Sequence, residues 1–206
     1  MADLFPACLA FVLRQEGGFV DNPRDPGGVT GAGGITLRAV KLRDFDRDGK
    51  LDFDLDHDGD VDRVDMLALR ADDPRVAEIY LDDYWILVRP RSGQIVTCGT
   101  FGPLVALCLF DCCINSGPRT AVALLQRAIG ATPDGMAGPK TLALAKGEVL
   151  EAFVAERSVF YARQETRQHF GDMRAFAAGT APPVFLRGWA RRLARVQTKC
   201  IEMGRS

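Results

Sequence analysis

Residues 16–36 read EGGFVDNPRDPGGVTGAGGIT, and this stretch is the most informative part of the chain about the fold. Glycine, proline, aspartate and asparagine dominate it, and the run at residues 25–28 (DPGG) is typical of tight turns around short strands or loops. The preceding residues 2–15 place apolar side chains at the i, i+3, i+4 spacing of a helix with one buried face. Gly17 and Gly18 then end that helix. The sequence therefore predicts a helix that leads into a small irregular or β portion.

Glu16 stands at the predicted C-terminus of this first helix. Backbone carbonyls at a helix C-terminus disfavour a carboxylate by about 0.3–1 kcal/mol, so the position favours the protonated acid. A protonated carboxyl is what glycosidic cleavage requires, because the leaving sugar oxygen has to receive a proton. Asp25 and Thr30 follow on the turn-rich segment, where they are placed to face the acid across a cleft. From the residues alone, a capped helix followed by a loop with an incidental glutamate remains open.

Helical periodicity returns later in the chain. Residues 74–87 form one predicted helix, and residues 102–113 are hydrophobic on nearly all sides, as expected of a central buried helix. Further helices are predicted over residues 118–130, 139–145, 149–170 and 184–203. In the last of these, Trp189 and Val196 are predicted to face inward and the basic residues, Arg192 among them, to face solvent. The fold class is therefore mainly α, with a small irregular or β portion near the N-terminus.

Composition excludes several classes of protein. The 206 residues are 47% hydrophobic and 26% charged, as in an ordinary globular protein. The longest apolar stretches, such as residues 104–110, fall well short of the roughly 20 residues of a membrane span. Residues 1–5 carry an aspartate where a secretory signal carries lysine or arginine. We therefore expect that the protein does not insert stably into a membrane. We also expect that it is synthesised into the cytoplasm without Sec export.

The six cysteines, at positions 8, 98, 108, 112, 113 and 200, form no CxxC pair and have no histidine at zinc-ligand spacing. Three of them lie on one apolar stretch, where a free cysteine behaves as a small core hydrophobe. Buried thiols are therefore predicted rather than a disulfide framework.

The net charge of −1 conceals an asymmetry. Residues 44–65 contain ten aspartates and three basic residues, which leaves 23 basic and 17 acidic residues elsewhere, a balance of about +6. A cationic body suits an anionic envelope polymer, although the same excess could serve solubility alone. Nucleic acid is not an expected partner, and the protein is expected to be a monomer.

The acidic insert at residues 44–65 contains two related loops. The pattern D-x-D-x-D-G-x-x-D begins at Asp44 and recurs at Asp54. It supplies carboxylates at positions 1, 3, 5 and 9 of a loop and glycine at position 6, an arrangement suited to Ca²⁺. Asp65 stands at position 12 of the second loop, whereas the first has Leu55 there and has to borrow Asp54 or bind weakly. The predicted ligands of one or two structural calcium ions are Asp44, Asp46, Asp48, Lys50, Asp52, Asp54, Asp56, Asp58, Asp60, Asp62 and Asp65, with Asp60 and its counterpart Lys50 acting through backbone carbonyls.

These loops resemble EF-hand, dockerin and thrombospondin-type calcium loops. The alternative is a solvated acidic or disordered run, since like charges at this density repel one another. Two features favour an ordered insert. Glycine stands at the same position of both loops, and apolar residues are interleaved with the aspartates: Leu51, Phe53, Leu55 and Val61. Calcium is expected to fold it and to fix a helix beginning near Val64, without a direct catalytic role.

The motifs of residues 16–36 resemble the EGG...DPGG.T..GIT signature of glycoside hydrolase family 108, phage-type N-acetylmuramidases with a lysozyme-like fold. Ile79-Tyr80 with Tyr84-Trp85 is similar to the IY...YW segment of that family. Several later motifs resemble the peptidoglycan-binding region that accompanies it: Phe110-Asp111, Asn115-Ser116-Gly117, Leu125-Gln126, Asp134-Gly135 and Gly138-Pro139-x-Thr141. The resemblance spans nearly the whole chain except the insert.

The resemblance implies Glu16 as the general acid, with Asp25 and Thr30 positioning water or substrate. Trp85 and Asn115 are candidate sugar contacts, and a core tryptophan and a structural asparagine are the alternatives. Residues 31–33 (GAG) depart from the family pattern, because the loop is one residue longer and lacks a larger polar or aromatic side chain. This departure affects the role inferred for Thr30, which follows from the loop geometry, and not the role inferred for Glu16.

The resemblance also implies a lysozyme-like α+β organisation. Residues 1–100 would form a catalytic region that contains the insert, and residues 101–206 a helical peptidoglycan-binding region packed with it as one globular unit. The predicted reaction is hydrolysis of the β-1,4 bond after N-acetylmuramic acid in peptidoglycan. The predicted setting is an endolysin that waits in the cytoplasm until a holin gives it access to the periplasm and cell wall; a gene-transfer or secretion-associated muramidase would share these features.

Two hypotheses from other classes remain open at this point. One is a non-catalytic, calcium-dependent cell-wall-binding or scaffold module that keeps the fold. The other is a calcium-regulated protein in which the acidic loops act as a sensor.

Overall fold

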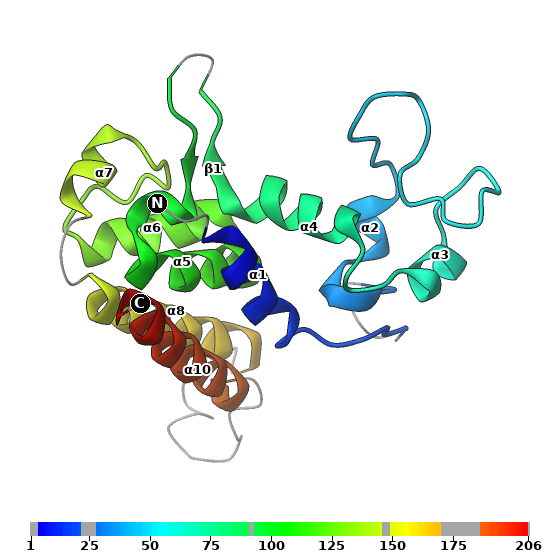
Figure 1. Cartoon of the computed structure of the whole chain (residues 1–206). Coiled ribbons are helices and arrows are strands. Elements are labelled where there is room, and N and C mark those ends of the chain that lie inside the picture. The colour runs from blue at the N-terminus through cyan, green and yellow to red at the C-terminus, as the bar shows by residue number, and fades with distance from the viewer. Residues whose placement is uncertain (1–3, 22–27, 91–92, 146–148, 170–185, 206) are drawn as a thin grey trace. The chain divides into compact units, whose positions relative to one another are not determined.

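The computed structural model describes residues 4–21, 28–90, 93–145, 149–169 and 186–205 (Figure 1). The chain divides into two compact units. Residues 6–82 form the first, called here the N-terminal unit, and residues 1–5 with 83–206 form the second, the C-terminal unit. The expected division near residue 100 concerned which region has which function, and it stays a prediction.

The N-terminal unit consists of short helices joined by turns. Phe5–Leu13 form α1, Ala32–Gly34 a 3₁₀ turn, Leu37–Val40 α2, Arg63–Ala68 α3 and Pro74–Tyr80 α4. Between α1 and α2, Thr30 forms antiparallel bridges with Val20 on one side and Thr36 on the other. These bridges are the small β portion expected after the first helix.

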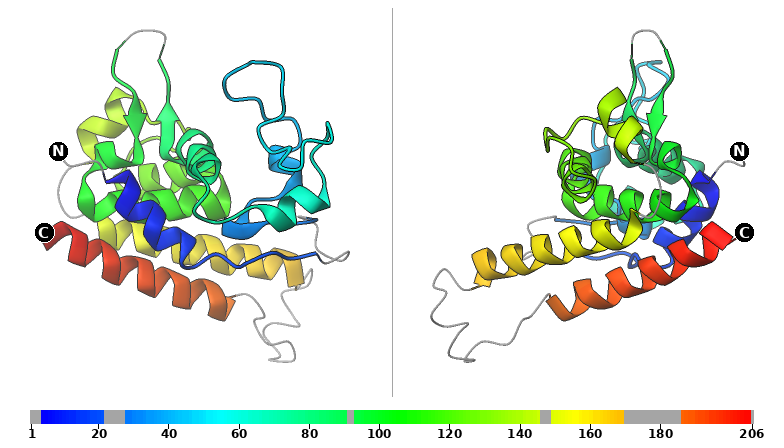
Figure 2. Two further views of the ribbon diagram at one scale, coloured as in Figure 1. Left: turned by 45° about the vertical axis from the view of Figure 1, so that its right-hand side comes forward. Right: turned by 90° about the vertical axis from the view of Figure 1, so that its left-hand side faces the viewer.

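The acidic insert takes part in the core of the N-terminal unit. Its Phe53 and Val61 are buried, as are Met66 on α3 and Val76 on α4. In Figures 1 and 2 the insert forms the two cyan loops between α2 and α3. Phe53 and Val61, two of the apolar residues interleaved with the aspartates, therefore anchor the insert in this core.

The C-terminal unit is mainly helical. A π-helical turn, Leu81–Trp85, leads into the antiparallel strands β1 (Ile86–Val88) and β2 (Val96–Thr97), and a 3₁₀ turn, Cys98–Phe101, follows. The helices are α5 (Pro103–Ser116), α6 (Pro118–Ala128), α7 (Pro139–Leu144), α8 (Leu150–His169) and α10 (Leu186–Arg205). Figure 2 shows α8 and α10 side by side and antiparallel. Residues 105–113 of α5 are all buried, which confirms the predicted central helix.

The mainly α fold class is confirmed, whereas the predicted helix over residues 74–87 is wrong in its last two residues. Helix α4 is followed directly by the π-helical turn that ends at Trp85, and Ile86–Val88 form a strand that pairs with β2. The reason is that a short apolar run such as Ile86-Leu87-Val88 suits a strand and a buried helix equally, and here the partner strand decides. The predicted burial of the cysteines is confirmed, because all six are buried and none is in a disulfide.

Candidate active site

Glu16 lies three residues beyond the end of α1 at Leu13, whereas the sequence predicted a helix through residue 15. Its backbone N–H donates to the carbonyl oxygen of Val12 at 3.1 Å, which continues the helical hydrogen-bonding pattern to this residue. Its side chain is half-buried and rests on Gly34. A Cβ atom added to Gly34 would lie 2.8 Å from Oε2 of Glu16, and Gly34 has a φ of +72°. Glycine at position 34 thus satisfies both the backbone conformation and the close approach of the carboxyl group.

The glycines that depart from the family pattern are required by their neighbours. A Cβ on Gly31 would lie 2.9 Å from the carbonyl oxygen of Met66 on α3. Gly33 has a φ of +72°, and its carbonyl oxygen accepts a 2.6 Å hydrogen bond from the buried hydroxyl of Tyr80. A larger side chain at these positions would collide with α3 or strain the turn, so the small residues fit the loop to the helices behind it.

Thr30 lies in the small β-bridged structure that follows Glu16 in the chain. Its backbone exchanges two hydrogen bonds of 2.8 Å with Val20, and its hydroxyl lies 3.4 Å from the carbonyl oxygen of Gly28. Thr30 also bridges to Thr36, two residues after Gly34. Asp25, the third residue of the predicted series, lies outside the described residues. The roles assigned to Glu16, Asp25 and Thr30 stay predictions.

The two candidate sugar contacts lie in the C-terminal unit. Trp85 is only 3% exposed, and its ring packs against those of Phe5 and Phe110 at centroid distances of 5.4 and 5.2 Å. This geometry favours the core tryptophan over a sugar platform. Asn115 is exposed, and its amide nitrogen donates to the carbonyl oxygen of Asp111 at 2.7 Å. An exposed asparagine at a helix end remains compatible with either interpretation.

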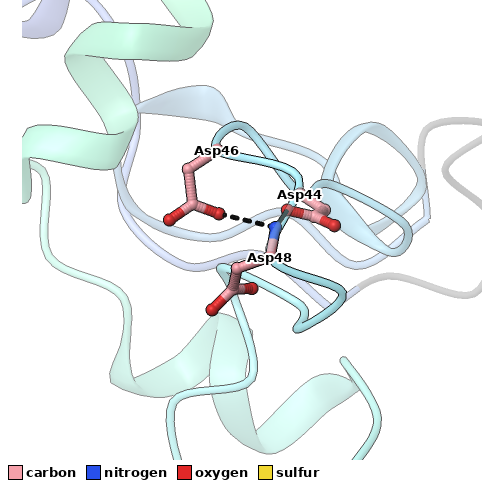
Figure 3. Close-up of side chains that lie close together, drawn as sticks. All are labelled: Asp44, Asp46 and Asp48. Carbon is pink, nitrogen blue, oxygen red and sulfur yellow. Dashed lines mark hydrogen bonds between the residues drawn. The ribbon is translucent and has the colours of Figure 1, made fainter.

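The two acidic loops of the insert repeat each other in conformation. In the first loop Asp44 accepts hydrogen bonds from the backbone of Asp48 and Gly49, at 3.1 and 3.0 Å. In the second loop Asp54 accepts from Asp58 and Gly59 at the same two distances. Figure 3 shows the three carboxylates of the first loop, Asp44, Asp46 and Asp48, gathered around one space. Potential ligand oxygens of these three lie within 4.8 Å of one another, and Asp54, Asp56 and Asp65 form a similar group.

A different aspartate closes each of the two loops by a hydrogen bond. In the second loop Oδ1 of the buried Asp65 accepts from the backbone N–H of Leu55 at 2.6 Å. In the first loop the matching N–H, that of Phe45, donates to Oδ2 of Asp52 at 2.5 Å. Both oxygens of Asp54 accept hydrogen bonds from the second loop. The expectation that the first loop borrows Asp54 as a ligand or binds a cation weakly stays a prediction.

Local desolvation and the surrounding carboxylates raise the pKa of Asp56, which faces the charges of Asp58, Asp65 and Asp54. Crowded carboxylates of this kind repel one another, so a cation placed among them would relieve an existing electrostatic cost.

A family model described as glycosyl hydrolase 108 matches residues 9–117, which contain Glu16 and the whole acidic insert. The chain belongs to glycosyl hydrolase family 108. It is a glycoside hydrolase that acts on peptidoglycan. SagA of Brucella abortus is similar to it in structure, with a TM-score of 0.62 and 26% sequence identity over 98% of this chain and 96% of that one. No curated protein matches the chain.

The family 108 hydrolase contains a buried ionic network that sequence reasoning missed. Asp111 on α5 is fully buried, and its oxygens accept from Arg157 of α8 at 2.6 Å and from Arg192 of α10 at 2.7 Å. Arg157 also donates to the hydroxyl of Tyr161 at 2.8 Å and to the carbonyl oxygen of Cys108 at 2.9 Å. Burial opposes the charge of Arg157, but neighbouring charges, Asp111 among them, hold its pKa well above the usual value.

This network corrects the predicted exposure of one residue of α10. Arg192 was expected to face solvent with the other basic residues, but its side chain is only 19% exposed and binds Asp111. The attraction of a buried carboxylate for cations overrides the amphipathic pattern at this position. No helix within the described ranges combines the length and the hydropathy of a membrane span.

Proposed function

We propose that this family 108 hydrolase is an N-acetylmuramidase in which Glu16 is the general acid. The observation that carries the proposal is the placement of Glu16: it lies three residues after the end of α1 and within the family match, and its carboxyl group rests on the glycine turn at Gly34. Gly17 and Gly18, both exposed, have no Cβ to obstruct a polymer that approaches the acid.

In the proposed reaction Glu16 donates its proton to the oxygen of the β-1,4 bond after N-acetylmuramic acid. The bond between the anomeric carbon and that oxygen breaks, and water supplies the hydroxyl group that replaces it. Thr30 and Asp25 are proposed to orient the water or the sugar. A static hydrogen-bonded ladder that fixes Thr30 supports this assignment, since positioning groups act only if they are held in place.

Analysis of the reducing ends released from purified sacculi tests the proposal. A muramidase leaves N-acetylmuramic acid at the new reducing end, and the wild-type protein is expected to yield this product. Release of N-acetylglucosamine ends, or of free peptides without new reducing ends, would contradict it. Binding to sacculi without any product would favour the cell-wall-binding or scaffold alternative.

We propose further that residues 101–206 help to hold peptidoglycan and that the protein serves as an endolysin released to the wall through a holin. The motifs of residues 110–141 that resemble a peptidoglycan-binding region support the first of these assignments. Gln126, part of one of these motifs, donates to Asp134 at 2.7 Å and to Thr141 at 3.0 Å. The motif residues are thus joined in one hydrogen-bonded turn, which would give a binding surface a fixed backbone.

We propose that the insert binds one or two structural Ca²⁺ ions. Each loop gathers carboxylates whose oxygens lie within 4.8 Å of one another, a span that suits a cation with ligand distances of about 2.3–2.6 Å. The aspartates of each loop would hold the ion, and the ion would neutralise their repulsion. Filling the second loop would also fix the start of α3, because Asp62 and Asp65 form the capping box of that helix.

Excess calcium is expected to raise the thermal midpoint by about 5–10 °C over the protein in EGTA, because an ion that binds only the folded state at about 100 times its Kd stabilises by ~2.7 kcal/mol. Differential scanning calorimetry measures the shift. Asp65→Asn should reduce it, since Asp65 closes the second loop. Asp72→Asn is the matched control, because Asp72 is exposed, pairs with Arg70 and lies outside the loops. Equal midpoints in calcium and EGTA would remove the proposal.

A further inference from the structure

We infer that Arg63 is a positioning residue for hydrolysis: from the first turn of α3 it holds the segment Phe19–Asp21 where the reaction requires it. The inference rests on the proposed role of Glu16, which lies three residues before Phe19. Arg63 belongs to the acidic insert, and this positioning role does not depend on a cation in the loops.

Two side-chain contacts join Arg63 to this segment. Its Nε lies 2.6 Å from Oδ2 of Asp21, and its guanidinium carbon lies 5.5 Å from the ring centroid of Phe19. A planar guanidinium that binds a carboxylate at its edge and an aromatic ring at its face fixes both the position and the direction of the segment. An ammonium group would keep the charge and lose that directional fit.

Helix α3 also contacts the segment that is bridged to this one. Val20, between the two residues that contact Arg63, exchanges both backbone hydrogen bonds with Thr30 at 2.8 Å. The next residue, Gly31, lies against Met66 of α3, with 2.9 Å between an added Cβ and the carbonyl oxygen of Met66. Both bridged segments are therefore in contact with one short helix, α3.

Two routes connect these bridged segments to Glu16, one along the chain and one through Gly34. Gly17 and Gly18, which join Glu16 to Phe19, restrict the backbone little, so the place of this segment depends on contacts farther along. Gly34, on which the Glu16 carboxyl rests, stands two residues before Thr36, which bridges to Thr30. A displacement of about 1 Å between reacting groups can cost about 10²-fold in rate, so a loosened ladder should lower turnover.

Arg63→Ala is therefore expected to lower kcat on soluble glycan strands about tenfold, with a smaller change in KM. Its thermal midpoint should fall by less than about 2 °C, because an exposed ion pair contributes little to stability. Arg63 and Asp21 have side chains that are 56% and 34% exposed. Arg70→Ala is the matched control, since Arg70 lies 2.9 Å from Asp72 in an exposed ion pair; its kcat should equal that of the wild type. All variants are assayed in excess calcium.

The charge exchange Arg63→Asp with Asp21→Arg should recover part of the kcat lost in either single variant. If Arg63→Ala does not fold, Arg63→Lys replaces it, and an intermediate kcat at an unchanged midpoint is expected. Wild-type kcat in the variant used would overturn this inference alone. Absence of cleavage by the wild-type protein would overturn the proposed function and this inference with it.

Discussion

Glu16→Gln should lower kcat for glycan hydrolysis by about 10²–10⁴-fold, the range that a positioned general acid contributes. Glutamine has nearly the same shape, so the side chain can still rest on Gly34, but it has no acidic proton to give to the leaving oxygen. The loss should fall on kcat rather than on KM, because the proton transfer is made only in the transition state. Release of reducing ends from soluble glycan strands measures both constants.

Glu78→Gln is the control for this substitution. Glu78 is an exposed glutamate of α4 in the same unit, so removing its charge changes the local electrostatics without touching the proposed acid. Binding of Glu16→Gln to sacculi should match that of the wild type, which separates lost chemistry from lost affinity. Hydrolysis by Glu16→Gln at the wild-type rate would exclude Glu16 as the acid.

The sequence predicts much of the fold because most of its elements are marked locally. The first helix ends at Leu13, shortly before Gly17-Gly18, Pro103 and Pro118 begin α5 and α6, and the pattern of aspartates and glycines gives both acidic loops the same conformation. These signals act over a few residues and need no knowledge of the partner segments. Glu16 could be placed near a helix end for the same reason.

What the sequence does not predict depends on residues far apart in the chain. The strand Ile86–Val88 requires its partner β2, and the small residues at 31–34 require Met66, Tyr80 and Glu16 as neighbours. The contact between Arg63 and Asp21 spans 42 positions. The sequence around either residue does not predict this pair, because exposed charged residues have many alternative partners.

The buried network of the C-terminal unit had signals that could have revealed it. Asp111 is an acid inside the predicted central buried helix, and a charge in that environment demands a partner of opposite charge. Arg157 lies four residues from both Phe153 and Tyr161, on the buried face of α8. An arginine at the apolar spacing of one helix and an aspartate in another are a candidate pair, although the sequence cannot state which helices meet.

Arg157→Met is expected to lower the free energy of unfolding by about 3–5 kcal/mol, because removing one partner leaves the charge of Asp111 poorly compensated in the core. The thermal midpoint should fall by about 10 °C in a chain of this length. Methionine matches the arginine side chain only as far as Nε, so it keeps the packing of the aliphatic stem and loses the guanidinium contact with Tyr161. Calorimetry measures the change, and Arg70→Met, which removes an arginine from an exposed ion pair, should change the midpoint little.

The double variant Arg157→Met with Asp111→Leu distinguishes an electrostatic cost from lost packing. Replacing both partners by apolar groups removes the buried carboxylate that Arg157→Met leaves behind, and Arg192, already 19% exposed, can turn toward water. The double variant should therefore be more stable than the sum of the two single losses predicts, with a coupling of about 1–3 kcal/mol. Additive losses would contradict this account, since they would mean that the three helices meet through packing alone and that the charges contribute nothing specific to their junction.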